Sequence, residues 1–142
     1  MTSQNYPNFL VRAAASVLST AIILILMAVL FGNRVQPAYF PELEPQTESF
    51  GWLLGGMVLM GLFIAYLYPF LRIEVGEGWF THALKVAVPF GLTIFFATHM
   101  VQAGYIQISA TGWLLEGLYD SAAPMVAVVV LAWLSHRKHK NS

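Results

Sequence analysis

The sequence predicts an all-α integral membrane protein, a four-transmembrane-helix bundle with both termini cytoplasmic. Of its 142 residues, 58% are hydrophobic and only 10% are charged, whereas a soluble domain has about 25% charged residues. A soluble chain of this size would need more polar residues to cover its surface. Four apolar segments, each close to the roughly 20 residues that cross a bilayer, supply the predicted spans.

Charge and cysteine content exclude several classes of function. Seven Lys and Arg residues balance seven Asp and Glu residues, so bulk attraction to nucleic acid is not expected. The absence of cysteine excludes disulfides, thiol nucleophiles and cysteine-based metal or iron–sulfur sites. We therefore expect the lipid bilayer as the main partner, and a single membrane domain over residues 1–142.

The first predicted span covers about residues 11–31 and has an uninterrupted apolar centre. A secretory signal is the competing interpretation, because Arg12 precedes this apolar run near the N-terminus. No small-residue cleavage pattern follows the run, so we favour an uncleaved span. The loop over residues 32–50 holds three prolines and three glutamates. Prolines at this spacing exclude a continuous helix, so we expect an acidic connector on the outer side.

The second predicted span, about residues 51–71, carries small residues at four-residue spacing: Gly51 with Gly55, and Gly61 with Ala65. Small side chains on one flank of a helix let a second helix backbone approach closely. The second helix is either another span of this chain or a second copy of the protein. We favour the internal contact, because such patterns are common within membrane bundles.

The third and fourth predicted spans cover about residues 80–102 and 112–134 and are joined by a short turn without charged residues. The third contains Pro89 and the fourth contains Pro124. A proline inside a helix removes a backbone hydrogen bond and kinks the helix. We therefore expect both helices of this hairpin to bend.

The distribution of positive charge predicts the orientation. Four spans place both termini on one side, together with six of the seven basic residues, namely Arg12, Arg72, Lys85, Arg137, Lys138 and Lys140. Arg34 alone lies on the opposite side. Positive charge favours the cytoplasm, so we place both termini there and the protein in the inner (cytoplasmic) membrane of a bacterium.

The hairpin of the third and fourth spans carries the candidate site. Counting from the centre of the connecting turn, at about 1.5 Å per residue, places His99 and Glu116 at nearly the same depth on antiparallel helices. Asp120 lies one turn deeper, on the same face as Glu116, because residues four apart share a face. Thr98 and Gln102 lie near His99. The sequence thus predicts a polar cluster in the outer half of the membrane.

Two kinds of role suit this cluster. Two carboxylates in a medium of low dielectric constant repel each other, so we expect at least one to be neutral at pH 7. An imidazole beside them favours a shared proton, and such a group can relay protons or bind a cation or a polar headgroup. The other interpretation is a hydrogen-bonded clasp that fixes the hairpin, at about 0.6 kcal/mol per bond on membrane-protein averages. Both interpretations stay open.

The residue pattern supplies no catalytic constellation and no metal site. Neither His-x-x-x-His nor Glu-x-x-His occurs, and one of these is typical of helical metal sites. His82 and His99 are too far apart on one helix to sandwich a haem, which leaves a single-histidine chlorin or haem at His99 as the cofactor alternative. We expect no cofactor, and we interpret the basic tail of residues 136–140 as a segment that binds anionic lipid headgroups.

A short motif opens the fourth span: Trp113-Leu-Leu-Glu-Gly-Leu-Tyr119, preceded by Ala103-Gly-Tyr105. In this motif and in the order and spacing of its spans, the chain resembles the uncharacterised small four-span bacterial integral membrane proteins. The resemblance implies a four-helix membrane fold with no established activity. The chain is also similar in size and span count to the small multidrug-resistance exporters. Those keep an essential glutamate in the first span, where this chain has no acidic residue.

These observations favour a non-enzymatic accessory or scaffold subunit, as a homo-oligomer or as part of a larger membrane complex. In this hypothesis the polar cluster stabilises the hairpin and holds a polar ligand. The alternative is a small transporter or channel, coupled to protons or cations, in which Glu116 and Asp120 carry the charge. A lipid- or quinone-linked enzyme stays open as a third class, without a catalytic constellation to support it.

Overall fold

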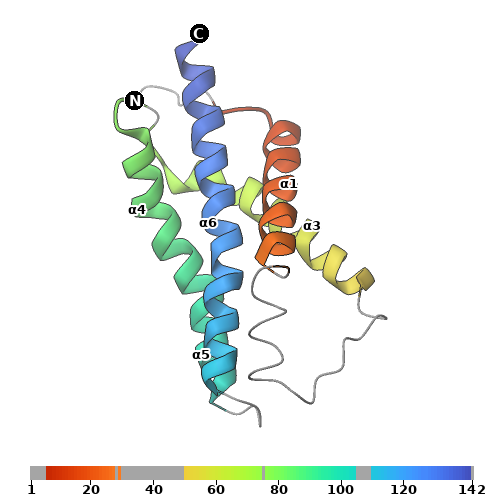
Figure 1. Ribbon diagram of the computed structural model, residues 1–142. Coiled ribbons are helices and arrows are strands. Elements are labelled where there is room, and N and C mark those ends of the chain that lie inside the picture. Colours follow the sequence, from red (N-terminus) through yellow and green to blue (C-terminus); the bar gives the residue numbers. More distant parts are fainter. Residues whose placement is uncertain (1–5, 28, 30–49, 75, 105–109, 142) are drawn as a thin grey trace.

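The computed structural model describes residues 6–27, 29, 50–74, 76–104 and 110–141 (Figure 1). Its longer helices are α1 (Phe9–Met27), α3 (Phe50–Leu67), α4 (Trp79–Gly91), α5 (Ala97–Ala103) and α6 (Ala110–Lys140). Two shorter helical turns complete the described fold: the 3-10 turn η3 (Tyr68–Leu71) and the π-helical turn η4 (Leu92–Phe96). The first closes α3, and the second joins α4 to α5.

Four helical segments are long and apolar enough to cross a membrane: Phe9–Met27, Leu54–Leu71, Trp79–Val101 and Ala110–Lys140. The predicted fold class, an all-α protein with four membrane-spanning helices, is therefore confirmed. The chain is a small four-helix integral membrane protein. The cytoplasmic placement of its termini stays a prediction, and the predicted acidic loop of residues 32–50 lies outside the described residues apart from the first residue of α3.

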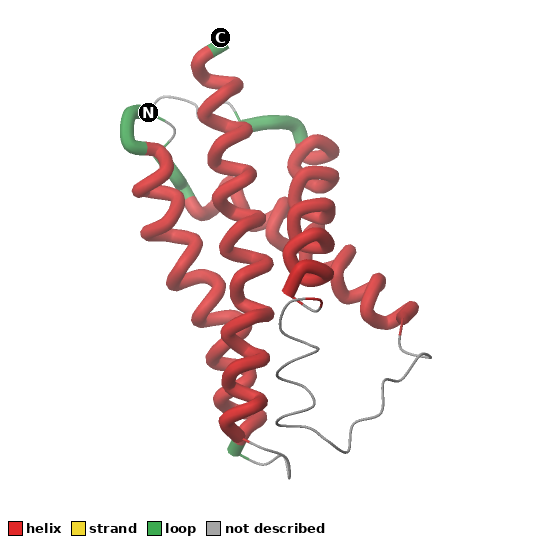
Figure 2. Tube along the Cα trace, in the orientation of Figure 1, coloured by secondary structure: helices red, strands yellow, loops and turns green. Residues whose placement is uncertain are grey.

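Helix α6 extends well beyond the predicted end of the fourth span at residue 134. Its 31 residues measure about 46 Å at about 1.5 Å per residue, against a hydrocarbon thickness of about 30 Å. The last turn contains Arg137, Lys138, His139 and Lys140, and cations there interact favourably with the negative end of the helix dipole. Pro124 lies inside α6, which continues past it without a break (Figure 2).

Helix α6 is the centre of the bundle. It packs against α1 on one side and against α4, η4 and α5 on the other, while α1 also packs against α3 (Figure 1). The buried face of α6 consists mainly of small side chains, including Gly117, Ser121, Ala123, Ala127, Ala132 and Ser135. In a bilayer, helices associate by close packing rather than by the hydrophobic effect, so this face lets several neighbours approach one helix.

Helices α1 and α3 touch at Gly61. A Cβ atom on Gly61 would lie 2.6 Å from Cα of Val17 and 2.8 Å from its backbone nitrogen, so the two backbones are in contact. Ala65, one turn later, is fully buried. By contrast, a Cβ atom on Gly51 or Gly55 would have no atom of the described residues within 4 Å. A packing partner for these two glycines stays a prediction.

The N-terminal segment is fastened to the far end of the chain. The backbone oxygen of Tyr6 accepts a hydrogen bond from Lys138 Nζ at 3.0 Å, and the Tyr6 hydroxyl donates to the carbonyl oxygen of Pro69 at 3.4 Å. The Tyr6 ring lies edge-on to that of Tyr68, with 5.7 Å between centroids. The start of α1, the end of α3 and the end of α6 therefore meet at one end of the bundle.

Gly61→Ala should destabilise the protein by about 1–3 kcal/mol, because the added methyl group meets the backbone of α1 and cannot be accommodated by a rotamer change. The control is Val88→Ala, at an exposed position of α4 away from the α1–α3 contact, where a substitution usually changes stability by about 0.5 kcal/mol or less. Unfolding by SDS titration in mixed micelles, followed by circular dichroism, measures both. Equal stability of the two variants would contradict the contact.

Alkaline pH should loosen the N-terminal segment. Burial raises the pKa of Tyr6, and the nearby Arg12 and Arg72 lower it in part. Because the folded-state pKa exceeds the unfolded value of about 10, the stabilisation is complete below that value and is lost as the pH rises through the folded-state pKa. The thermal midpoint of the parent should therefore fall more steeply above about pH 10 than that of Tyr6→Phe. Parallel curves for the two proteins would refute this coupling.

Candidate functional site

His99 of α5 faces Asp120 of α6. Nε2 of His99 lies 3.4 Å from Oδ2 of Asp120, and the side chains are 12% and 39% exposed, respectively. The distance suits an ion pair or a long hydrogen bond. The imidazole is therefore largely enclosed, whereas the carboxylate remains partly accessible.

The second ring nitrogen of His99 determines how many protons the pair holds. Nδ1 lies 2.9 Å from the carbonyl oxygen of Phe95, and because a carbonyl can only accept, Nδ1 must carry the proton and donate it. In a neutral ring Nε2 is then an acceptor, facing a carboxylate oxygen that is also an acceptor. The contact is attractive only when one proton lies between them, as imidazolium with carboxylate or as imidazole with carboxylic acid.

His99 occupies a notch on α6 formed by Trp113, Gly117 and Asp120. These residues follow a spacing of four and three, so they lie on one face of the helix. A Cβ atom on Gly117 would be 2.6 Å from Cβ and 2.7 Å from Cγ of His99, so only glycine leaves room for the imidazole there. The ring of Trp113 lies against the imidazole, with 5.1 Å between centroids and a tilt of 40°. The notch therefore fixes the position of the imidazole along α6.

The π-helical turn η4 explains why His99, rather than Thr98, faces α6. Gly91 contacts α6, because a Cβ atom there would lie 2.8 Å from the backbone oxygen of Ser121. Each residue turns an α-helix by about 100°, so seven residues later Thr98 would face α6 and His99 would point about 80° away from it. A π-turn contains about one residue more than an α-turn. The turn therefore rotates His99 inward and leaves Thr98 exposed.

The other predicted cluster residues occupy different surroundings. Glu116 is half-buried, one turn before Asp120, and interacts electrostatically with both Asp120 and His99. Neither carboxylate is fully buried. The hydroxyl of Thr98 donates to a carbonyl of its own helix at 2.6 Å, and the side chain of Gln102 lies outside the described residues. The structure thus brings His99 and Asp120 together with Glu116 nearby, and leaves Thr98 outside the pair.

Trp113 and Gly117 belong to the motif that opens the fourth span but are not among the predicted site residues. Their spacing relative to Asp120 could have indicated the site, because it places a small residue between an aromatic and an acidic residue on one face of the helix. His99 lies opposite Gly117, the residue next to Glu116 and therefore at nearly the same depth.

Metal and cofactor binding find little support among the described residues. In that part of the chain no three His, Cys, Asp or Glu side chains are grouped so that they could hold a metal ion. Both ring nitrogens of His99 face acceptors of the protein itself, so a chlorin or haem could be ligated only after separation from Asp120. The second histidine contact, His82 Nε2 to Glu74 Oε2 at 3.2 Å, is a surface pair and contributes little.

Comparisons with protein-family models, curated proteins and solved structures find no match for this chain. The family resemblance suggested by the segment Trp113–Tyr119 therefore stays a prediction. Its structural implication, four helices of membrane-spanning length, is observed. The function must be argued from the geometry.

The His99–Asp120 pair should show energetic coupling in a double-mutant cycle. His99→Gln and Asp120→Asn together should cost less than the sum of the single changes, with a coupling of about 0.6 to 1.7 kcal/mol, the range for polar contacts between membrane helices. The free energy of unfolding of the parent, the two single variants and the double variant is measured by SDS titration. The control cycle pairs Thr98→Val with Asp120→Asn and should be additive within about 0.5 kcal/mol. Equal coupling in both cycles, or none in the first, would count against the contact.

Proposed function

We propose that this protein is a non-enzymatic accessory or scaffold subunit of the bacterial inner (cytoplasmic) membrane, with the whole chain forming one membrane domain. The observation that carries this proposal is the enclosure of His99. Its ring nitrogens are directed at Phe95 and Asp120, and its ring is held between Gly117 and Trp113. Groups that satisfy each other in this way act as a clasp between α5 and α6, which supports a structural role over catalysis.

The first half of α3 supports association with another helix. Gly51, Gly55 and Gly56 are exposed, and none would bring a Cβ atom within 4 Å of another residue. In Figure 1 this end of α3 diverges from α1 and α6. A glycine-lined flank allows a close helix–helix approach. A homo-oligomer, or a larger membrane complex, would supply the missing helix.

The position of the basic residues supports cytoplasmic termini. Arg12 lies in the first turns of α1, Arg72 follows η3, and Lys138 lies near the end of α6. Contacts of Tyr6 with Pro69 and Lys138 show that these three regions meet. The end of the bundle at which basic residues gather is expected to face the cytoplasm.

A second candidate function is a proton- or cation-coupled transporter or channel that uses Glu116 and Asp120. It is favoured by the single proton that the His99–Asp120 contact requires and by the partial exposure of Asp120, since a proton relay needs a shared proton with access to the outside. A polar ligand bound at the carboxylates of Glu116 and Asp120 would also reach them through the exposed side of Asp120.

The scaffold proposal predicts that another helix packs against the glycine-lined flank of α3, and the oligomeric state of the purified protein tests it. Gentle detergent extraction followed by size-exclusion chromatography with light scattering should recover an oligomer or a stable complex. Gly55→Leu should disrupt it, because the larger side chain prevents close approach. The control Val88→Leu changes an exposed residue of α4 and should leave the assembly intact. A strictly monomeric parent without a co-purifying chain would reject the proposal.

The transporter alternative is tested in proteoliposomes under a pH gradient. If it is correct, Glu116→Gln and Asp120→Asn should reduce flux to the level of empty liposomes while circular dichroism shows retained helicity. Glu77→Gln, an exposed carboxylate outside the hairpin, is the matched control and should transport normally. Absence of flux in the parent protein would eliminate this alternative.

A further inference from the structure

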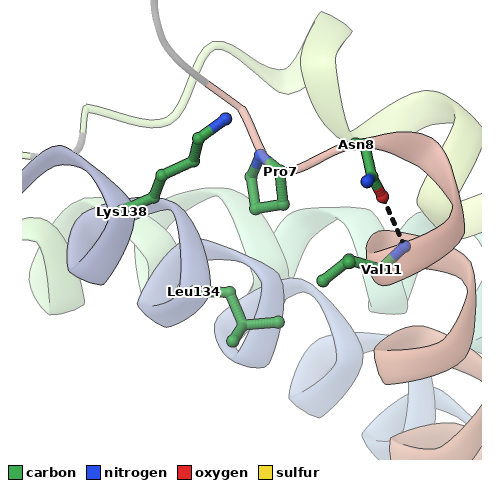
Figure 3. Close-up of a pocket in the computed structure, with 5 residues that line it drawn as sticks. All are labelled: Pro7, Asn8, Val11, Leu134 and Lys138. Atoms are coloured by element: carbon green, nitrogen blue, oxygen red, sulfur yellow. Dashed lines mark hydrogen bonds between the residues drawn. The ribbon is translucent and has the colours of Figure 1, made fainter. Parts of the chain in front are cut away.

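A hollow lies between the start of α1 and the end of α6. It has a volume of about 320 Å³ and is lined by Pro7, Asn8, Val11, Leu134 and Lys138 (Figure 3). The side chains of Pro7, Val11 and Leu134 supply an apolar wall, and Lys138 supplies the one charged group of the lining. Asn8 is engaged locally, because its Oδ1 accepts the backbone N–H of Val11 at 2.9 Å. The lining therefore combines hydrocarbon with a single cation.

We expect the hollow to lie at the height of the membrane boundary. Val11 and Leu134 belong to membrane-spanning segments, and Lys138 follows Leu134 by one helical turn. Trp133 beside it is partly exposed, and the guanidinium of Arg137 lies 4.6 Å from the centre of its ring. Tryptophan and arginine side chains of this kind mark the zone between acyl chains and headgroups. The apolar wall thus faces the acyl chains and Lys138 faces the headgroups.

Lys138 is held in place at the mouth of the hollow. Its ammonium donates to the backbone oxygen of Tyr6 at 3.0 Å, which restricts a side chain that is otherwise flexible. An ammonium group has three donors and can contact several oxygens. Further positive charge is close in sequence, at Arg137 and Lys140, and none of the described residues that line the hollow is acidic.

We infer that this hollow binds one anionic phospholipid, with the phosphate at Lys138 and the upper part of an acyl chain along Val11 and Leu134. Charge complementarity and depth support this occupant, because basic pockets between helices on the cytoplasmic side bind anionic headgroups, and the proposed orientation places this end of the bundle on that side. The volume is at the lower end of the range for small-molecule sites, about 300–1,000 Å³. It therefore accommodates a headgroup and the first chain carbons rather than a whole lipid. The inference does not depend on the role of the hairpin.

Native mass spectrometry of the full-length protein, released from nanodiscs, tests this site. The probes are phosphatidylglycerol, phosphatidylcholine with the same acyl chains, and glycerol phosphate as a headgroup without chains. The parent should retain phosphatidylglycerol selectively. Lys138→Gln should weaken its retention about fivefold, the effect of one interfacial basic residue. The matched control Lys140→Gln removes the same charge two residues away, outside the lining, and should have a smaller effect.

A second variant distinguishes lipid binding in the hollow from lipid binding by diffuse surface charge. It also shows whether the loss in Lys138→Gln comes from a folding defect. Val11→Trp fills the space without changing charge, so it should reduce phosphatidylglycerol retention while circular dichroism shows unchanged helicity. Equal retention of the two lipids, equal losses in the two lysine variants, or parent-like binding by Val11→Trp would each overturn the inference. Binding of glycerol phosphate as tight as that of the lipid would also overturn it, since it would indicate a soluble phosphate ester.

Discussion

Close approach of helix backbones at glycine is the constraint on which this bundle depends. Lipid tails solvate leucine as well as another helix does, so association requires tight packing. Gly61 brings α3 onto the backbone of α1, Gly91 brings α4 onto that of α6, and Gly117 admits His99 into the surface of α6. The small residues on the buried face of α6 likewise allow its other neighbours to pack closely against it. The central helix is thus defined by side chains that occupy little space.

The polar pair is a consequence of this packing. Without the gap at Gly117 the imidazole could not lie beside Asp120, and without the π-helical turn it would point elsewhere. Once inside, the ring is oriented by the Phe95 carbonyl and by Trp113. The same contacts that make the pair an effective clasp also require one proton between Nε2 of His99 and the carboxylate of Asp120. Structural and proton-carrying roles therefore use one geometry, and solution measurements must distinguish them.

The sequence predicts the four-span fold well, because length and apolarity are set by the bilayer itself. It also indicates that His99 and Glu116 lie at similar depth, with Asp120 one turn deeper on the same face, since a short turn makes the two helices antiparallel. It does not reveal rotation about the helix axis. Nothing in the residues of η4 distinguishes a π-turn from an ordinary turn, yet that turn decides which of Thr98 and His99 faces inward. The sequence also does not predict where the fourth helix ends, because the last turn of this helix is charged and yet remains helical.

The proline inside α6 has one more consequence. Pro124 carries no amide hydrogen, so the main-chain carbonyl of Asp120, four residues earlier, receives no donor from that position. On the facing helix, Pro89 similarly leaves the carbonyl of Lys85 without its usual donor, and the π-turn follows a few residues later. The regular backbone ladder is therefore interrupted in each helix of the hairpin, at the Asp120 carbonyl in α6 and at the Lys85 carbonyl in α4. A helix bends most easily where a backbone hydrogen bond is missing, and in α6 that place is the carbonyl of Asp120, the residue whose side chain faces His99.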